Sequence, residues 1–429
     1  MSTDRQDDVG INRRSFSSGA LVGAASLLAA KPSDVHAAES SVIRVGLVGC
    51  GGRGTGAAIN AMRADPSVRI VALADLFDSA MQKCRKGLGE RYADQFIVDD
   101  DHCFEGFEGY KTLLQSDVDV VLLCSPPYYR PDHIEASVEA GKEIFCEKPV
   151  ATDAAGVTRV REACKKADEK SLNVVSGLCW RYDRGMQETV KRVHDGEIGT
   201  LISVQANYLT NPIWKKTRKP GEDELMYQCR NWYNYAWLSG DHIVEQHIHS
   251  IDKVLWLHRD KPPQMAYGMG GRMNRSDLTE GDIYDHFAVV YEWPDQTRAY
   301  TYTRQMRGCF NETKDFAFGS LGRASLTEHV IDGVSPWKFE GEEVQMHQAE
   351  QNEFFKAVRG ERERINNGEY MCNSTLMAIL GREVCYSGKK LLFEDVAQSG
   401  QRLGPVELVE GGAAPDVRVK KPGRYDPIS

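Results

Sequence analysis

An apolar run that leads into a cluster of glycines, between Val42 and Ile59, constrains the fold more than any other stretch of the sequence. Valine, isoleucine and leucine dominate Val42–Val48, which predicts a buried strand. Gly49-Cys50-Gly51-Gly52-Arg53-Gly54 follows at once, and small residues with Ile59 then continue at helical spacing. A buried strand that turns directly into a helix through glycines is typical of the first βα unit of a parallel sheet.

The glycines also indicate a phosphate-binding turn. Gly49 would permit the tight turn, Gly51 would let the backbone approach a pyrophosphate, and Gly54 would let helix and strand pack closely. The amino end of the helix would add unpaired N–H donors and the positive end of its dipole. Gly52 and Arg53 lie between these glycines and complete the expected phosphate-binding segment.

Asp75 makes a dinucleotide the expected ligand. It ends a second apolar run, Val68–Ala74, and lies about 20 residues beyond the glycines, where an acidic residue that binds the adenosine ribose hydroxyls is expected. Its carboxylate would repel a 2′-phosphate, so NAD is favoured over NADP, although Arg53 provides a cation nearby. The alternative is that Asp75 only caps a turn.

Strand and helix patterns alternate from Val42 to about Cys179 and predict a parallel, doubly wound sheet covered on both faces. After the first two strands, further strands are expected at Val118–Cys124, Glu143–Cys146 and Leu172–Cys179, with helices at 56–63, 79–92, 133–140 and from Thr152 or Asp153 to about Lys170. Open α/β sheets bind ligands at the carboxyl ends of their strands. Ser125-Pro126-Pro127 and Glu147-Lys148-Pro149 follow two of these strands and are therefore candidate site residues.

The second half of the chain has a different pattern. After a helix at Gly185–His194, strands that alternate apolar and polar residues predict a large, open, mostly antiparallel sheet with one wet face; they are expected at 200–209, 264–270, 285–292, 297–305, 315–319 and 323–327. Helices are expected at Gln348–Val358 and Asn373–Ser387. We therefore divide the chain into three parts. Residues 41–180 form the domain with the parallel sheet, residues 181–403 form an α+β domain, and residues 404–429 form an extended carboxyl-terminal arm.

Several of these residues together resemble the Gfo/Idh/MocA family, which includes glucose–fructose oxidoreductase and inositol dehydrogenase. They are Gly49–Gly54, Asp75, Ser125-Pro126-Pro127, His133, Glu147-Lys148-Pro149 and Arg181-Tyr182. The resemblance implies an NAD-binding Rossmann domain followed by an α+β domain, whose open sheet covers the active site and often mediates oligomerisation. It also implies that the cofactor site includes Ser125, Pro126, His133, Glu147 and Lys148.

The segment Leu238–Leu257 is the second candidate functional element. On a continuous helix, His242, Glu245 and His249 would share one face. Family members carry Asp-x-x-x-His followed by an acidic or polar residue, Ile and Asp; His249-Ser250-Ile251-Asp252 is similar, but Glu245 stands where Asp is usual. The resemblance therefore implies a catalytic group of Lys148, His249 and Glu245.

These three residue types suit the oxidation of a secondary alcohol, in which a nicotinamide accepts the hydride and a base accepts the hydroxyl proton. His249, with an ordinary pKa near 6.5, suits the role of base. Lys148 would polarise the substrate oxygen, and Glu245 would orient His249 or bind a substrate hydroxyl. The alternative is that His249 is an ordinary core histidine and Lys148 an ordinary surface lysine. We expect no metal, because His247 would point away from His249 on a helix and no H-E-x-x-H is present.

An aromatic stretch, Tyr227–Leu238, offers candidate sugar contacts. Arg230, Trp232 and Tyr233, together with Arg181 and Tyr182, could stack on and hydrogen-bond a sugar ring. The alternative is that the aromatic side chains belong to the core or to an interface.

Charge and cysteine content exclude other classes of protein. A formal charge of −9 with no clustered basic patch argues against non-specific nucleic-acid binding. The 11 cysteines are scattered and show no C-x-x-C spacing, so neither a disulfide framework nor a structural metal site is expected. The protein is therefore expected to fold in a reducing compartment.

The amino terminus resembles a twin-arginine export signal. Asn12-Arg13-Arg14-Ser15-Phe16 precedes an apolar run, Gly19–Ala30, that is too short to span a bilayer, and Val35-His36-Ala37 has a small-residue cleavage pattern. We expect residues 1–37 to be removed near Ala37, leaving a periplasmic or otherwise exported protein with no membrane span. An ordinary secretory signal or an anchor is the alternative.

Three functions are consistent with the sequence. The first is an NAD-dependent oxidoreductase that acts on a secondary hydroxyl of a sugar, polyol or sugar derivative, with tightly bound NAD because little free NAD exists outside the cytoplasm. The second is an NAD-requiring glycosidase, similar to the α-N-acetylgalactosaminidases of the family. Such an enzyme transiently oxidises a ring hydroxyl, eliminates the aglycone and then returns the hydride. The third is a non-catalytic nucleotide- or sugar-binding protein. A homo-oligomer, dimer or tetramer, is expected in each case.

Overall fold

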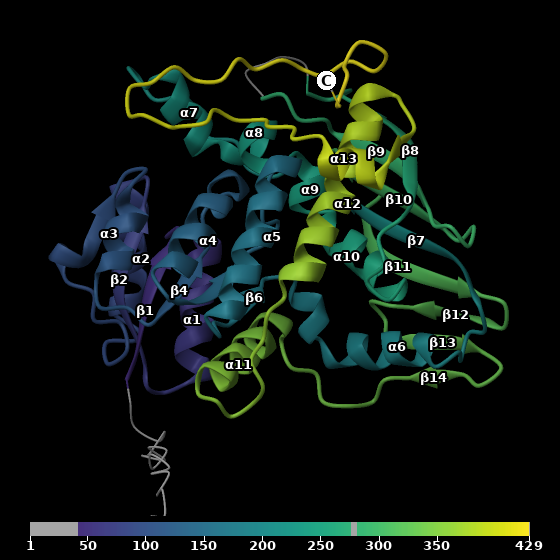
Figure 1. The fold of residues 1–429 in the computed structure, drawn as a ribbon, viewed down its shortest axis with the longest axis horizontal. Coiled ribbons are helices and arrows are strands. Elements are labelled where there is room, and N and C mark those ends of the chain that lie inside the picture. Colours follow the sequence, from purple (N-terminus) through teal and green to yellow (C-terminus); the bar gives the residue numbers. More distant parts are fainter. Residues whose placement is uncertain (1–41, 276–280, 429) are drawn as a thin grey trace, which may run out of the picture. The chain divides into compact units, whose positions relative to one another are not determined.

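The computed structural model describes residues 42–275 and 281–428 (Figure 1). These residues belong to one compact unit. The expected export signal, residues 1–37, lies outside the described residues. In the part of the chain that is described, no helix is long and apolar enough to cross a membrane.

The first half contains a six-stranded sheet in the order β3-β2-β1-β4-β5-β6, and every pairing in it is parallel. Its strands are β1 (Ile43–Val48), β2 (Val68–Asp75), β3 (Cys103–Glu105), β4 (Val120–Leu123), β5 (Glu143–Cys146) and β6 (Val174–Ser176). The helices of this half are α1 (Gly52–Ala64), α2 (Asp78–Gly89), α3 (Gly109–Gln115), α4 (Arg130–Glu139) and α5 (Ala154–Glu169). The direction in which successive strands are added to the sheet reverses between β1 and β4, and sheets of this kind bind ligands at that point.

Both faces of this sheet are buried, as the continuous apolar runs predict. Neighbouring residues of β4 show this, because Val120 and Val121 are fully buried yet belong to separate core clusters on opposite faces. The predicted doubly wound sheet is therefore confirmed. The strand expected at Leu172–Cys179 is shorter, because β6 has only three residues. Gly177, which follows it, packs against Glu147, and the chain then forms a 3-10 turn, η3 (Cys179–Tyr182).

The second half contains a nine-stranded sheet in the order β14-β13-β12-β11-β7-β10-β9-β8-β15. Its strands are β7 (Leu201–Thr210), β8 (Met265–Gly271), β9 (His286–Glu292), β10 (Arg298–Gln305), β11 (Glu312–Gly319), β12 (Gly322–Ser325), β13 (Val330–Gly333), β14 (Trp337–Lys338) and β15 (Leu391–Leu392). Strands β7 and β10 pair in parallel and the other described pairings are antiparallel, which confirms the mostly antiparallel sheet.

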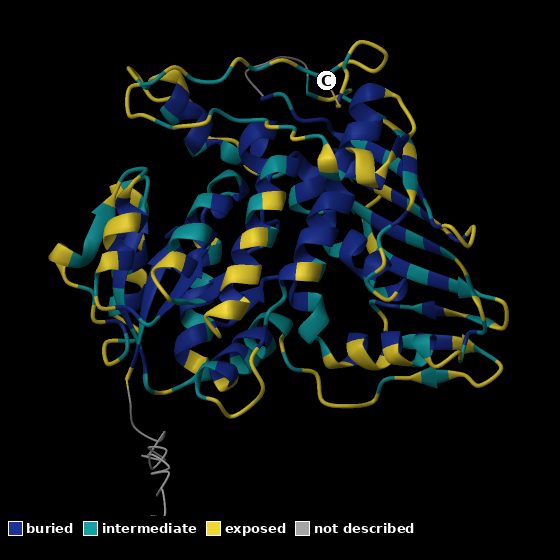
Figure 2. Cartoon of the chain, viewed as in Figure 1, coloured by how far each residue is buried: buried dark blue, intermediate teal, exposed yellow. Residues whose placement is uncertain are grey.

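The helices of the second half are α6 (Arg184–His194), α7 (Glu224–Arg230), α8 (Ala236–Ser239), α9 (His242–Glu245), α10 (Ile248–Leu257), α11 (Met346–Val358), α12 (Gly368–Ser387) and α13 (Phe393–Gln398). Helices α10 and α12 pack on one face of the nine-stranded sheet, and α12 is buried along nearly its whole length (Figure 2). On β10, Thr301 and Thr303 face this core, whereas Tyr302 between them is 40% exposed. The sheet thus has the one wet face that the alternation predicts.

The carboxyl-terminal helices return to the first half. Helix α11 packs on α1, where Asn60 Nδ2 donates to Gln348 Oε1 at 3.0 Å and Arg359 Nε donates to Asp65 Oδ2 at 2.7 Å. Helix α12 packs on α5. The two sheets therefore share core elements and are not joined by a simple linker near residue 180.

The segment Leu238–Leu257 is not one continuous helix, so the prediction that His242, Glu245 and His249 share a single helical face is wrong. Helix α9 ends at Glu245 and α10 begins at Ile248. Asp241, with φ of 74°, fixes the start of α9, because its carboxylate accepts hydrogen bonds from the Tyr284 backbone N–H at 2.8 Å and the Tyr386 hydroxyl at 2.5 Å.

Residues 404–428 contain neither helix nor strand and run across both halves of the chain. Tyr128 lies a few residues after β4, and its hydroxyl donates to the Pro405 carbonyl at 2.7 Å. The Tyr284 hydroxyl, near β9, donates to the Lys420 carbonyl at 2.7 Å. This arm therefore links the carboxyl edge of the parallel sheet to the second sheet.

Candidate active site and cofactor site

The glycine turn between β1 and α1 fits a dinucleotide. A side chain at Gly49 (φ +94°) would place its Cβ 2.5 Å from the Ser125 nitrogen, and one at Gly54 would place it 1.8 Å from the Gly49 oxygen. Nothing lies within 4 Å of the Cβ positions of Gly51 and Gly52. No side chain caps the amino end of α1. Two glycines thus close the turn, while the other two leave open space beside N–H donors that a pyrophosphate can use.

Asp75 closes the same turn from the end of β2. Its Oδ2 accepts a hydrogen bond from the Cys50 N–H at 2.7 Å, and its Oδ1 accepts one from the Phe77 N–H at 2.9 Å. Burial raises the pKa of this carboxyl, and the positive charge of Lys216 opposes that change. Asp75 therefore caps the turn, as the alternative interpretation held, and also lies where the ribose of a dinucleotide is bound in such sheets.

Arg53 is engaged at the other end of the site. Its Nε lies 3.1 Å from Glu147 Oε1, and Glu147 is buried. Its Nη2 also approaches Asn60 Oδ1. Since its guanidinium faces Glu147, Arg53 is not the cation beside Asp75.

Ser125, Pro126 and His133 lie at the carboxyl end of β4. Ser125 Oγ and His133 Nδ1 are 3.0 Å apart, and burial lowers the pKa of His133 to about 3, so this imidazole is neutral. Arg130, which the sequence analysis did not single out, donates to the carbonyls of Ser125 at 2.8 Å and of Pro149. Arg130 thus fixes the loop after β4 against the Glu-Lys-Pro loop after β5.

The structure pairs two of the three proposed catalytic residues, Lys148 and Glu245, and the charge of Lys148 also acts on the third, His249. Lys148 Nζ lies 3.0 Å from Glu245 Oε1 and also donates to the Glu245 carbonyl oxygen. His249 is in the first turn of α10, and its Nδ1 is buried with no hydrogen-bond partner among the described residues. Burial lowers the pKa of His249 well below its usual value, with a further contribution from the charge of Lys148. The imidazole is therefore neutral and able to accept a proton.

Side chains from two strands of the second sheet, β10 and β7, lie beside this group. Gln305, at the end of β10, donates from Nε2 to the Tyr233 hydroxyl at 2.8 Å and to Gln246 Oε1 at 2.9 Å. Its Oε1 is buried without a partner among the described residues. Tyr208, on β7, packs edge-on against His247 with ring centroids 6.2 Å apart. The sequence analysis did not identify Gln305 and Tyr208. The available signal was that both stand at inward-facing positions of strands whose side chains alternate between buried and exposed.

The other predicted substrate contacts have partners within the protein. Arg181 binds the carboxylates of Asp252 and Asp260 and stacks on Tyr370 with its guanidinium carbon 3.9 Å from the ring centroid. The Tyr182 hydroxyl donates to Asn367 Oδ1 at 3.0 Å, Arg230 pairs with Glu222, and Trp232 packs edge-on against Trp214. Of the five predicted substrate contacts, Tyr233 is the one that joins the polar group around Gln305.

His242 and His247 are buried away from any common ligand position. His242 Nδ1 lies 3.2 Å from the Tyr284 carbonyl oxygen. Burial lowers the pKa of His247 to about 3. Both are side chains of the interior, and His247 is neutral there.

Comparisons with known proteins agree with this geometry. Residues 43–175 match the Gfo/Idh/MocA family model, described as an oxidoreductase family with an NAD-binding Rossmann fold, which confirms the dinucleotide expected from the glycines. Inositol 2-dehydrogenase 3 from Saccharopolyspora erythraea is 28% identical over 219 residues, 51% of this chain and 54% of that protein. Inositol 2-dehydrogenase from Rhizobium meliloti is 26% identical over 250 residues, 58% of this chain and 65% of that protein. The chain thus spans between half and two thirds of the length of these curated relatives.

Solved structures show the same fold. The scyllo-inositol dehydrogenase of Lactobacillus casei with bound NAD(H) and scyllo-inositol has a TM-score of 0.62 at 17% identity, covering 82% of this chain and 100% of that one. The aldose-aldose oxidoreductase of Caulobacter crescentus complexed with glycerol has a TM-score of 0.65 at 16% identity, with the same coverage.

Proposed function

We propose that this chain is an NAD-dependent oxidoreductase that oxidises a secondary hydroxyl group of a sugar, polyol or sugar derivative. The observation that carries the proposal is the convergence of Lys148 from one half of the chain with Glu245 and His249 from the other, at the carboxyl edge of an NAD-binding sheet. The names of the curated relatives, inositol 2-dehydrogenases, support a polyol or cyclic sugar as the substrate class.

The residues of the site divide the work of alcohol oxidation. Bound NAD would supply the hydride acceptor. Lys148 would hold the substrate oxygen and stabilise negative charge on it, and neutral His249 would accept the hydroxyl proton. The Glu245 carboxylate fixes the Lys148 ammonium, and the buried amide of Gln305 offers an acceptor for a neighbouring substrate hydroxyl.

We further infer that the NAD stays bound between turnovers. The support is the cover over the carboxyl edge of the parallel sheet: Tyr128 packs edge-on against Trp237 with ring centroids 4.9 Å apart, and the Tyr129 hydroxyl lies 3.3 Å from Cys229 Sγ. Leu403, just before the carboxyl-terminal arm, and Leu408 within it pack on the same apolar cluster. Release of the dinucleotide would require these contacts to separate, so denaturing the purified protein should liberate NAD that dialysis does not remove.

A substrate panel tests the function. The purified protein is mixed with polyols, free sugars and aryl glycosides while the near-ultraviolet absorbance of reduced nicotinamide is followed. Reduction by a polyol or sugar that is lost in Lys148→Ala, by about 10²–10⁴-fold in kcat/KM, supports the proposal. Release of a chromophoric aglycone without net reduction would assign the glycosidase activity instead. Lys148→Ala with unchanged turnover would contradict a catalytic role for this site.

We also propose export through the twin-arginine route, on the strength of Arg13-Arg14 and the apolar run that follows them. Replacing both arginines with lysine should leave uncleaved precursor in the cytoplasm. Exported protein that still begins at Met1 would contradict removal of the segment near Ala37.

A further inference from the structure

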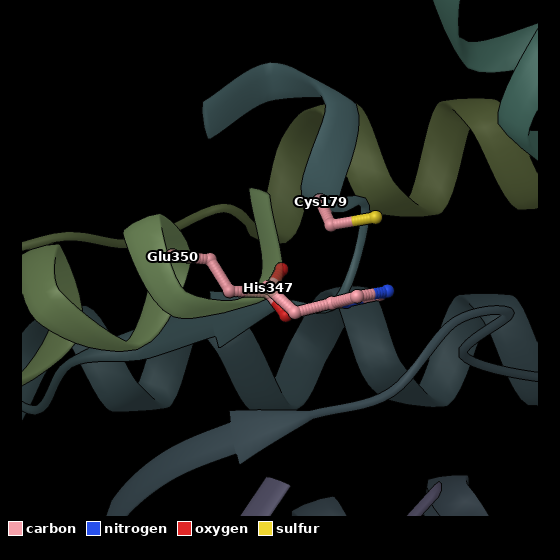
Figure 3. Close-up of side chains that lie close together, drawn as sticks. All are labelled: Cys179, His347 and Glu350. Atoms are coloured by element: carbon pink, nitrogen blue, oxygen red, sulfur yellow. The ribbon is translucent and has the colours of Figure 1, made fainter. Parts of the chain in front are cut away.

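Three side chains that commonly bind metal ions, two buried and one partly exposed, meet outside the proposed catalytic group. Cys179 extends from η3, and His347 and Glu350 extend from α11 (Figure 3). One ligand atom from each lies within 4.8 Å of the other two. Cys179 is 1% exposed and Glu350 is 0% exposed. Among residues 42–275 and 281–428, no other group of three cysteine, histidine or acidic residues comes this close together.

Glu350 has one partnered and one unpartnered oxygen. Its Oε1 lies 3.3 Å from His347 Nδ1, but its Oε2 is buried and has no hydrogen-bond partner among the described residues. A buried carboxyl group with an unpaired oxygen is costly, and binding a metal ion is one way in which proteins satisfy such a group. Nearby Glu147 makes the cost larger, because its charge adds to the desolvation that raises the pKa of Glu350 and of the Cys179 thiol.

A divalent cation would change the ionisation of this cluster. Burial raises the pKa of Glu350 and of the Cys179 thiol and so favours the protonated form of both, while Glu147 pairs with Arg53. A bound divalent ion would displace these protons and lower the pKa of the groups that bind it.

The geometry suits a zinc-type ion. His347 and Glu350 are one helical turn apart and lie on the same face of α11, which packs on η3. Ligand atoms about 2.0–2.3 Å from a tetrahedral zinc ion lie roughly 3.5 Å from one another. Small side-chain rotations would therefore close the observed separation of up to 4.8 Å. Of the three side chains, His347 also lines a cavity of about 540 Å³, together with Arg53, Asn60 and Gln348.

We propose that Cys179, His347 and Glu350 bind one divalent transition-metal ion of the zinc class, with a fourth coordination position open to water. A thiolate, an imidazole and a carboxylate are the ligands that zinc prefers. The ion would fasten α11 to η3 behind Glu147 and so stabilise the loop that carries Lys148. This proposal does not depend on the reaction that the protein catalyses.

Cobalt(II) substitution tests the site directly. Full-length purified protein is treated with a chelator, dialysed and titrated with Co²⁺. We expect one equivalent to bind with thiolate-to-cobalt charge-transfer absorption, which Cys179→Ser abolishes and Cys164→Ser, a change at another buried cysteine, does not. Wild-type protein without this absorption, or equal absorption in Cys179→Ser, would overturn the proposal.

A second pair of variants covers the case in which Cys179→Ser does not fold. Glu350→Gln keeps the size of the side chain and removes a ligand charge, so Zn²⁺ affinity should fall at least about tenfold, and added Zn²⁺ should no longer raise Tm as it does in the wild type. Glu353→Gln, on the exposed side of α11, should bind Zn²⁺ like the wild type. Equal Zn²⁺ binding by wild type and Glu350→Gln would contradict the assignment.

Discussion

At the scale of single residues, the site depends on the pair formed by Lys148 and Glu245. The Glu245 carboxylate oxygen Oε1 lies 3.0 Å from the Lys148 ammonium nitrogen. Because Glu245 lies at the end of α9 and not on a helix shared with His249, the carboxylate positions the lysine of the opposite half of the chain. The residue is thus better described as a positioning residue for Lys148 than as a partner of His249.

Replacing Glu245 with Gln should lower kcat/KM by about 10²-fold, because the ammonium loses its charged partner and the substrate oxygen is held less firmly. Glu245→Asp keeps the charge and should retain most of the activity. Steady-state kinetics of the two variants with the best substrate of the panel measures the difference. Equal loss in both would contradict the view that the charge alone is sufficient, because Glu245→Asp retains it.

The pH dependence of activity should reflect the lowered pKa of His249. A base must be neutral to accept a proton, and burial keeps this imidazole neutral far below its ordinary pKa near 6.5. We therefore expect kcat/KM to stay level as pH falls through 6.5 and to decline only at lower pH. An acid limb centred near 6.5 would contradict this, provided that thermal melting shows the protein folded throughout.

Stability should fall on acidification because of the buried neutral histidines. His133 and His247 have folded pKa values of about 3, and an unfolded histidine has a pKa near 6.5. Between pH 3 and 6.5 the unfolded chain binds more protons, so the free energy of unfolding decreases as pH falls below 6.5. His247→Gln should flatten the dependence of Tm on pH in this window, whereas a change at exposed His102 should not.

At the scale of secondary-structure elements, the glycine turn separates folding from ligand binding. Gly49 and Gly54 are packed against neighbouring backbone, while Gly51 and Gly52 face open space. One short element therefore contains two positions that the fold requires and two that only a ligand would fill. Few elements of the chain allow such a clear comparison.

Gly54→Ala should lower the stability by about 1–3 kcal/mol through overpacking against the Gly49 oxygen. Gly52→Ala should leave Tm unchanged, since no described residue lies within 4 Å of its Cβ position, but should reduce the NAD that copurifies. Thermal melting and nucleotide analysis of the denatured proteins measure both effects. Full NAD content in Gly52→Ala would show that the dinucleotide does not approach this position.

At the scale of the whole molecule, the wet face of the nine-stranded sheet carries apolar side chains among polar ones. Tyr267, Val290, Tyr300, Gln205 and Phe316 form one row across five neighbouring strands. The next row includes Met269, which is 74% exposed, and Tyr302, followed by Asn207 and Lys314. Aromatic and aliphatic side chains mixed with polar ones are common at protein–protein interfaces. We propose that this face joins copies of the chain into the expected dimer or tetramer.

Tyr302→Glu should shift the protein toward monomers, because it places a charge in the centre of that face. Ile97→Glu, at an exposed apolar position of the other half, should leave the assembly unchanged. Light scattering coupled to size-exclusion chromatography gives the masses. A wild-type protein that elutes as a monomer at high concentration would exclude the proposed interface.

The sequence by itself determined the parallel sheet, its phosphate-binding turn, the mixed second sheet and the position of Lys148. These follow from signals within one or two neighbouring elements: unbroken apolar runs, strand alternation, and glycines at fixed offsets. The tertiary structure decided which partner each polar side chain has. Arg181 is engaged by Asp252 and Asp260, the helix expected around Glu245 is broken between α9 and α10, Gln305 lies beside Tyr233, and Cys179 meets Glu350. Such contacts join residues far apart in the chain, so they depend on how the elements return to one another and not on any local pattern.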